Sequence, residues 1–551
     1  MTTSDAAEAI DLQIMWSRLI AVVEEQAQVL IRTAFSTIVR ECGDLSAGVF
    51  DLQGRMLAQA VTGTPGHVNS MAESVRHFLR HFPVDGMREG DAYITNDPWM
   101  GTGHLNDFVV TTPAFHRGRL VALFSCTSHL MDIGGIGSGP EGTDVFMEGL
   151  YIPMLKLIDQ GRMNETLMAM IRANTRTPID TEGDTYSLAG CNDVGARRLS
   201  EMMEEFGLDT LDSLADYIVG RSRAAVLAEV ARLPRGTWSY AMDVDGYDEP
   251  IPLRAALTVS EAGLHMDFAG SGGRQHKGIN VPMAYTTAYT VFGMGCLVAS
   301  RIPNNAGSLA PLTVSAPRGC VLNVEKPAPV SSRHVLGMML PDMVFGCLRQ
   351  AVPNLVPAEG TNCLWNIVLR GTRRDGTVFA NTVTTSGGTG GRPTLDGLSC
   401  TGYPSGVQGT PVEIAETQSP ILFWRKEFRP GSGGAGRTRG GLGQIVELES
   451  AENLPFTVMA SFDRVRFAAR GQDGGQDGAR GQVGLASGAE LRSKGALPIA
   501  PGERLVLHTP GGGGLGPVAE RNPVSIVGDL ANELVSGPGE AGHPGPPSVG
   551  G

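Results

Sequence analysis

The stretch GTGHLNDFVVTTPAFHRGRLVALFSCTSHLMDIGG, residues 101–135, reads as a β-hairpin with histidines and aspartates near its open end. Two runs rich in Val, Thr and Phe lie on either side of HRGR at 116–119, a pattern typical of two antiparallel strands joined by a tight turn. Such a hairpin is a rigid frame on which polar side chains at the strand ends can meet. The surrounding elements are therefore interpreted outward from it.

The register of the hairpin decides which side chains face each other. With the turn centred between residues 117 and 118, paired residue numbers sum to about 235, so Asp107 faces Ser128 and Asn106 faces His129. Opposed residues on antiparallel strands have Cβ atoms about 4.5–5.5 Å apart. We therefore expect His104, Asp107 and His129 to come together at the open end of the hairpin.

Two imidazoles and one carboxylate with a free fourth position are typical of a catalytic site for a divalent metal, and Zn, Mn or Fe would suit these ligands. The alternative is two unrelated histidines with satisfied hydrogen bonds and an aspartate that caps a turn. The grouping at one end of one hairpin favours the metal site.

A further ligand has to come from another part of the chain. Glu41 and Asp44, in RECGDLS, follow the first predicted helix, where the helix dipole disfavours carboxylates, and this suggests a function for at least one of them. Plain solvent exposure is the alternative. The other candidates, each of which also reads as a turn former or a cap, are His67, Asp97 and Asp132.

Composition narrows the class of protein. The net charge of −13 argues against a nucleic-acid partner, which would require a basic surface. The cysteines are spread along the chain without a CxxC pair, which indicates a reduced, cytoplasmic protein without a zinc ribbon. No signal peptide is evident in MTTSDAAEAIDLQ. The uncharged segment 278–300 contains Asn280, Pro282 and several Thr and Tyr residues, so we expect a buried helix rather than a membrane span.

The chain is predicted to be a large, multilayer α+β protein. Residues 8–40 carry a 3.6-residue apolar stripe typical of a long helix, 67–82 form a second helix, and 160–232 are largely helical. After Pro234 the period changes to that of strands and Gly-rich loops. We therefore predict an N-terminal domain at 1–233 that holds the metal-binding hairpin among helices, a β-rich domain at 234–535, and a disordered Gly/Pro tail at 536–551.

Three Gly-rich stretches lie in the second half, at 385–397, 431–443 and 509–517. None of them matches GxxxxGK[ST] or a strand–GxGxxG–helix unit, so the chain has no ATP site of its own and the stretches are interpreted as tight structural loops. Arg437 and Arg439 leave open the alternative that the second stretch meets an anionic group.

A series of motifs follows in a fixed order, and the chain contains RECGDLSAGVFD, GTPGHVNSM, NDPWMGTGHLNDFVV, SHLMDIGG, FMEGLYIPMLKL, DFAGSGGRQHKGINVP, KPAPVSSR, PVEIAE and GSGGAGRTRGGLG. Over about residues 10–520 it thereby resembles the hydantoinase B/oxoprolinase family. This family includes N-methylhydantoinase beta subunits, the C-terminal half of 5-oxoprolinase, and subunits of caprolactamase and of acetone and acetophenone carboxylases. The chain departs from the usual pattern at Pro153-Met154, where two prolines are typical.

The resemblance implies one bound divalent metal, with Mn, Zn or Fe as candidates. The family's ligands are of the type Glu/Asp, His, Asp and His, and the matching positions are Glu41, His104, Asp107 and His129, with Asp44 as the competing first carboxylate. The resemblance also implies a hetero-oligomer with a hydantoinase A-type subunit that binds and uses ATP. That partner would explain why this chain carries no phosphate-binding signature.

From the resemblance we expect the metal-dependent beta subunit of an ATP-dependent hydrolase that acts on a cyclic amide such as a hydantoin, a lactam or 5-oxoproline. The partner would phosphorylate the substrate, and a water with a lowered pKa would attack the activated carbon at the metal site. Asp44 and Glu148 are the candidate general bases. Two alternatives stay open, a subunit of a ketone carboxylase of the acetone or acetophenone type and a non-catalytic assembly subunit.

Overall fold

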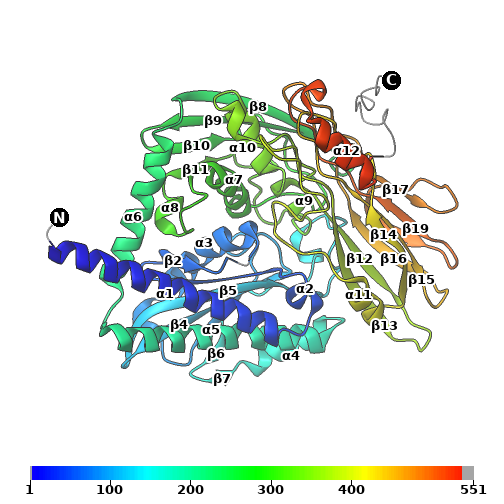
Figure 1. The fold of residues 1–551 in the computed structure, drawn as a ribbon. Coiled ribbons are helices and arrows are strands. Elements are labelled where there is room, and N and C mark those ends of the chain that lie inside the picture. The colour runs from blue at the N-terminus through cyan, green and yellow to red at the C-terminus, as the bar shows by residue number, and fades with distance from the viewer. Residues whose placement is uncertain (1–2, 62, 536–551) are drawn as a thin grey trace.

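The computed structural model describes residues 3–61 and 63–535, so the predicted tail at 536–551 lies outside the described residues. The chain forms a layered α+β fold, as predicted (Figure 1). Its central layer is a seven-stranded sheet in the order β2-β1-β5-β4-β3-β6-β7. The strands are β1 (Leu45–Phe50), β2 (Met56–Gln59), β3 (Ala92–Thr95), β4 (Asp107–His116), β5 (Arg119–His129), β6 (Leu155–Asp159) and β7 (Arg162–Met163).

Helices cover both faces of this sheet. α1 (Thr3–Thr33) and α5 (Pro178–Phe206) pack on one face, and α3 (Pro65–His81) packs on the other (Figure 1). Successive side chains of a strand point to opposite faces, and β5 follows this rule, because Phe124 packs with the α1 and α5 side chains whereas Leu123 packs with those of α3. The sheet is therefore buried on both sides, which shields the ends of β4 and β5 from solvent.

The first helix is shorter than its apolar stripe predicts. The single helix expected over 8–40 ends at Thr33, and a short helix, α2 (Thr37–Arg40), follows after a break. The buried Asp184 carboxylate accepts hydrogen bonds from the backbone N–H groups of Phe35 at 2.7 Å and Ser36 at 3.2 Å. These bonds satisfy two donors outside the helix, and the break directs the chain toward Asp44 at the start of the sheet.

The uncharged segment forms the buried helix α7 (Met283–Val298), as predicted. It packs between α3 and α10 (Leu340–Arg349). The approach to α3 is close, since a Cβ atom at Gly66 would lie 2.6 Å from the rings of both Tyr285 and Tyr289. Across residues 3–61 and 63–535, no helix is long and apolar enough to cross a membrane.

Sheets dominate from residue 236 onward, which confirms the β-rich C-terminal region. The proposed domain boundary near Pro234 falls in the link between α6 (Asp212–Val230) and β8 (Gly236–Val244), and the division itself stays a prediction. Three four-stranded sheets follow, in the orders β11-β10-β9-β8, β13-β12-β16-β18 and β14-β15-β19-β17. Their other strands are β9 (Ile251–Ser260), β10 (Gly263–Asp267), β11 (Leu312–Ser315), β12 (Leu364–Thr372), β13 (Val378–Ser386), β14 (Ile421–Phe428), β15 (Gln444–Ser450), β16 (Phe456–Ser461), β17 (Gln482–Leu485), β18 (Lys494–Ile499) and β19 (Leu505–His508). The remaining α-helices are α4 (Glu165–Asn174), α8 (Ala306–Leu309), α9 (His334–Gly337), α11 (Val412–Gln418) and α12 (Pro523–Ala531).

The three Gly-rich stretches pack backbone against backbone, which confirms their interpretation as structural loops. The N–H of Gly441 donates to Thr389 O at 2.8 Å, and the N–H of Gly512 donates to Gly441 O at 2.9 Å. A Cβ atom at Gly388 would lie 1.9 Å from Gly441 O, so a side chain is excluded at this contact. The two arginines of the second stretch pair with carboxylates, Arg437 with Glu520 and Arg439 with Asp529.

The β4–β5 hairpin differs from its predicted register by one residue at the open end. At the turn His116 pairs with Arg119, as predicted, but a β-bulge shifts the register between Ala114 and Phe115. The extra residue on β5 is Val121, and as a result Asp107 lies directly opposite His129 rather than Ser128. The bulge thus brings the aspartate and the histidine closer than the unbroken register would.

Candidate metal centre

The predicted hairpin residues come together. His104 lies in the loop before β4, Asp107 is the first residue of β4, and His129 is the last residue of β5. One ligand atom from each of the three lies within 4.8 Å of the other two. The side chains of His104 and Asp107 are buried, and that of His129 is 16% exposed. The group is therefore a compact and largely buried set of metal-type donors.

The two oxygens of Asp107 have different partners. Oδ1 faces the imidazoles, at 2.6 Å from His104 Nε2 and 3.1 Å from His129 Nδ1. Oδ2 accepts hydrogen bonds from Arg333 Nη2 at 2.5 Å and from the Thr102 hydroxyl at 2.7 Å, and it lies 3.0 Å from His67 Nε2. Burial alone would raise the pKa of Asp107, but the neighbouring imidazoles and Arg333 outweigh it and hold that pKa well below its usual range. One oxygen is thus fixed by the protein while the other is directed at the two histidines.

The hydrogen bond behind His104 defines its tautomer. His104 Nδ1 lies 3.0 Å from Ser331 O, and because a carbonyl oxygen only accepts, Nδ1 carries the proton. Burial and the positive charge of Arg333 lower the pKa of His104 to about 4, so the ring is neutral at physiological pH. The lone pair of Nε2 therefore points at the Asp107 carboxylate. The two atoms lie 2.6 Å apart, so either a proton or a bound metal ion has to offset their repulsion. In metal sites a ligating histidine commonly donates its other ring N–H to a carbonyl oxygen, as Nδ1 does here.

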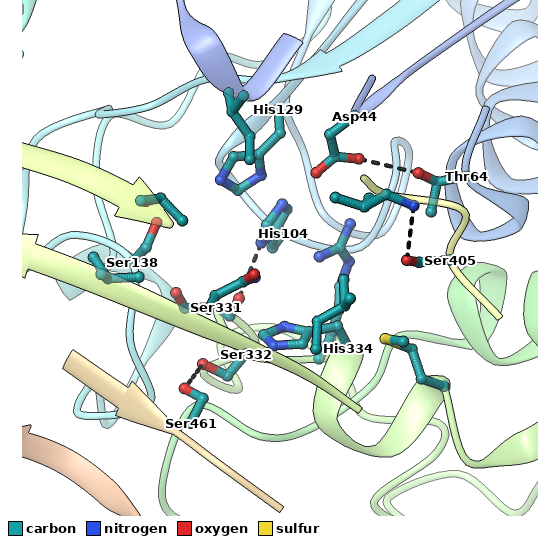
Figure 2. Close-up of a pocket in the computed structure, with 18 of the residues that line it drawn as sticks. Asp44, Thr64, His104, His129, Ser138, Ser331, Ser332, His334, Ser405 and Ser461 are labelled. Atoms are coloured by element: carbon teal, nitrogen blue, oxygen red, sulfur yellow. Dashed lines mark hydrogen bonds between the residues drawn. The ribbon is translucent and has the colours of Figure 1, made fainter. Parts of the chain in front are cut away.

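His67 and Asp44 extend the site on one side. The buried His67 lies between two carboxylates, with Nδ1 3.4 Å from Asp44 Oδ1 and Nε2 3.0 Å from Asp107 Oδ2. Burial lowers the pKa of His67, but the two carboxylates outweigh this effect and the net pKa is raised. The Thr64 hydroxyl donates to Asp44 Oδ1 at 3.0 Å. Asp44 is thereby held at the edge of the site, with its second oxygen on the side of the two histidines (Figure 2).

These residues line one pocket. Its volume is about 60 Å³ for the centres of water-sized molecules, which is room for a few waters or a small polar group. Figure 2 shows His104, His129, Asp44 and His334 around this space. His334 Nε2 is buried and has no hydrogen-bond partner in the described part of the chain, and burial together with Arg333 lowers the pKa of His334 to about 3. His334 therefore contributes to the pocket a neutral imidazole whose Nε2 has no partner among the described residues.

Of the two carboxylates proposed for the first ligand position, only Asp44 reaches the pocket. Glu41 is the C-cap of α2, its carboxylate pairs with the side chain of Arg40 at 3.1 Å, and it does not line the pocket. Asp97 and Asp132 are likewise occupied elsewhere. Asp97 accepts from Tyr151 and from the backbone of Trp99, and Asp132 pairs with Arg176 at 2.6 Å.

Glu148, a predicted general base, lies behind the pocket rather than in it. Its Oε1 accepts from the backbone N–H groups of Val330 at 2.7 Å and Ser331 at 2.9 Å. Burial raises the pKa of Glu148 to about 8. The side chain therefore braces the segment that carries the carbonyl behind His104.

Arg333 and His334 are missing from the sequence-based list of site residues. Arg333 is buried, donates from Nε to Thr102 O at 2.7 Å, and lies 4.1 Å from the ring centroid of Tyr285. The available signal was the pair Arg333-His334 at the end of KPAPVSSRH, which combines two groups that rarely occur buried. Its position beside Asp107 depends on a contact between residues 226 apart in the sequence, which no local pattern predicts.

Comparison with known proteins identifies the family of the chain. The family model for hydantoinase B/oxoprolinase matches residues 8–518. The caprolactamase subunit beta of Pseudomonas jessenii is 27% identical over 569 residues, covering 97% of this chain and 95% of the relative. The crystal structure of the ATP-dependent caprolactamase from Pseudomonas jessenii matches with a TM-score of 0.88 and 26% identity, over 97% of this chain and 96% of that one.

A nucleotide-free acetone carboxylase structure shares the fold, with a TM-score of 0.85 and 19% identity over 96% of this chain and 78% of that chain. At this identity the likeness concerns the fold alone. The match to the family model, in contrast, extends over nearly the whole chain. The chain belongs to the hydantoinase B/oxoprolinase family.

Proposed function

We propose that this chain is the metal-dependent subunit of an ATP-dependent hydrolase that acts on a cyclic amide. The observation that carries the proposal is the grouping of His104, Asp107 and His129, because one ligand atom from each lies within 4.8 Å of the other two and together they form a donor set that a divalent cation prefers. His104, His129 and Asp107 would hold the cation, and Asp44 is the proposed fourth ligand or general base. Mn, Zn and Fe all suit this donor set.

Such a cation, when bound, polarises a carbonyl or phosphoryl oxygen and lowers the pKa of water. The protein's own groups supply the rest. The Asp107 oxygen that faces Arg333 and Thr102 is fixed, so its other oxygen keeps its direction. Asp44 Oδ1 is engaged by Thr64, which leaves Oδ2 to accept a proton from the attacking water. The proton held on His67 between two carboxylates offsets their negative charge.

The substrate class and the partner are proposed from the family. Caprolactam, hydantoins and 5-oxoproline are cyclic amides, whose resonance makes direct attack by water slow. A hydantoinase A-type partner that uses ATP would phosphorylate the amide oxygen and thereby activate the carbon. The beta-subunit name of the caprolactamase relative supports a hetero-oligomer, and the lack of a phosphate-binding motif in this sequence supports the division of tasks.

The first test is elemental analysis of the purified chain beside the variants His104→Ala and His129→Ala. We expect about one Mn, Zn or Fe ion per chain, lost in both variants and retained in His265→Ala, whose histidine lies on the exposed face of β10. Absence of metal from the wild-type chain, even after incubation with Mn and Zn, would leave these histidines structural and favour an assembly subunit.

The second test is hydrolysis of lactams and hydantoins by the chain together with its ATP-binding partner. We expect ring opening that requires ATP, does not require bicarbonate, and is lost in His129→Ala. Because an acetone carboxylase shares the fold, a ketone substrate with a strict bicarbonate requirement would instead assign the chain to the carboxylases.

A further inference from the structure

A second, larger cavity adjoins the pocket lined by Asp44, His104 and His129, which is called the metal pocket below. Its volume is about 570 Å³, and it is lined by residues 400–409, the end of β13 at 384–386, and Lys426 and Gln444 on β14 and β15. Ser405 and Val407 line both cavities. Ser405 lies on the side of the metal pocket that also holds Asp44 and Thr64 (Figure 2). A group bound in the larger cavity would therefore adjoin the side of the metal pocket on which Asp44 lies.

The larger cavity carries one positive charge and no negative one. Among the described residues that line it, Lys426 is the one charged side chain, and the others are hydroxyl, amide, glycine and apolar residues. This contrasts with the chain as a whole, whose net charge is −13. The cavity is thus locally suited to an anion in an otherwise acidic protein.

A β-bulge directs Lys426 into this cavity. On β14, Phe423 pairs with Leu448 and Arg425 pairs with Glu447, so Trp424 is an extra residue. The bulge reverses the alternation of the strand, and Lys426 lies opposite the buried Val446 instead of facing solvent. Bulges that re-aim a side chain are common beside functional sites. Without the bulge, Arg425 and Glu427 would lie on this face of β14 and Lys426 on the opposite face.

Lys426 also lacks a carboxylate or aromatic partner among the described residues, whereas the other lysines of the chain each have one. Its ammonium donates to Thr410 O at 2.6 Å and forms no salt bridge within the described residues. Burial lowers the pKa of Lys426, and the exposed carboxylate of Glu413 acts in the opposite direction. Lys156 pairs with Asp91, Lys277 with Glu141 and Lys494 with Asp463. Lys326 lies over the ring of Tyr151.

Gln444 provides a second, independent observation. Its Oε1 is buried and has no hydrogen-bond partner in the part of the chain that the structure describes, and its side chain lines the same cavity. A buried amide oxygen and a half-buried ammonium, both with unused hydrogen-bonding capacity, cost stability when no ligand satisfies them. An amide oxygen only accepts, so Oε1 suits the hydroxyl of a singly protonated phosphoryl group, whereas the ammonium of Lys426 suits the anionic oxygens of that group.

We infer that this cavity binds the phosphoryl group of the activated substrate, with Lys426 as its cation and Gln444 as a neutral partner. The inference rests on the proposed function, since it assumes a phosphorylated intermediate. Lys426 is a binding residue in this scheme and does not contact the reacting carbon. A phosphoryl group held here would leave the amide carbon free to extend past Ser405 toward the metal pocket.

The test uses the full-length chain, freed of metal with EDTA, and inorganic phosphate as the probe. Calorimetry should detect phosphate binding by the wild-type chain and by His129→Ala, because the site does not depend on the metal ligands. Lys426→Met should weaken binding about tenfold or more, the loss expected for a charge-assisted hydrogen bond. Lys326→Met, which removes an exposed lysine outside the cavity, is the matched control and should bind as the wild type does.

Folding of the variant is checked separately. Because Lys426→Met replaces a half-buried ammonium that forms no salt bridge among the described residues, its melting temperature without phosphate should be no lower than that of the wild type. Gln444→Leu is the second variant and should also weaken phosphate binding. Equal phosphate affinity in the wild type and Lys426→Met, or no phosphate binding at all, overturns the inference.

The source of the phosphoryl group is distinguished with phenyl phosphate. Binding of this monoester at least as tight as that of inorganic phosphate identifies the site as one for the substrate's phosphoryl group. Binding of inorganic phosphate without binding of phenyl phosphate would identify the cavity as a site for the released product and would overturn the assignment to the intermediate. Absence of metal from the wild-type chain in the elemental analysis would refute the proposed function without affecting these phosphate measurements, so the two failures are separable.

Discussion

Replacement of Glu148 by glutamine tests the electrostatics behind the metal pocket. Glu148 is 1% exposed, Oε1 accepts two backbone hydrogen bonds, and Oε2 is buried without a partner among the described residues. Burial raises the pKa of this carboxyl from 4.5 to about 8, although the two N–H donors act in the opposite direction. Glutamine keeps the acceptor oxygen for both N–H groups and does not titrate, so the variant removes the ionisation while retaining the hydrogen bonds.

The sign and size of the effect follow from linkage. Because the folded-state pKa is raised, the folded chain holds a proton that the unfolded chain has already released between pH 4.5 and about 8, and stability falls as the pH rises through this range. One pKa unit corresponds to about 1.4 kcal/mol, so the difference between 4.5 and about 8 amounts to about 5 kcal/mol at most. A chain of 551 residues that unfolds as one unit changes its melting temperature by about 1 °C per kcal/mol.

The assay is thermal unfolding at pH 5, 6, 7 and 8. Glu148→Gln should melt close to the wild type at pH 5 and about 3–4 °C above it at pH 8. Glu204→Gln is the control, since hydrogen bonding to Arg117 lowers the pKa of that exposed carboxylate and it does not titrate in this range. A melting difference between Glu148→Gln and the wild type that is the same at every pH would refute the reasoning.

Three further predictions concern the glycine contacts and the metal ligands. Gly388→Ala should lower the melting temperature by several degrees or prevent folding, because its Cβ would lie 1.9 Å from a carbonyl oxygen. Gly190→Ala, on the exposed side of α5, should instead stabilise the chain by about 0.5–1 kcal/mol. Thermal unfolding of both variants beside the wild type checks the pair. Arg333→Lys should weaken metal binding about 10–100-fold, measured by competition with a chelator, since the guanidinium fixes the second oxygen of the aspartate ligand. Asp44→Asn should lower the metal content and Glu41→Gln should not, and the reverse result would restore Glu41 as the first carboxylate.

Local sequence patterns predicted the elements near the site well. The hairpin, its turn at 116–119 and the helix at α3 follow from periodicity and turn chemistry, which act between neighbouring residues. The grouping of His104, Asp107 and His129 also follows from the hairpin, because two paired strands bring residues about 20 positions apart into contact. The sequence pattern missed the break in the first helix, since Asp184 lies far along the chain and its carboxylate competes for the backbone there.

Taken alone, the sequence determined the class of fold, the hairpin and the grouping of three side chains in the candidate metal centre, because these depend on alternation and on short-range pairing. Tertiary structure alone decided the rest. The extra residue Val121 decided that Asp107 faces His129, since a shift of one residue exchanges the partners along a strand. The positions of Arg333 beside Asp107 and of Lys426 inside its cavity were decided by the packing of distant segments and by a second bulge. A local pattern specifies which face of an element is apolar, but which remote charge is buried against it depends on how the layers close.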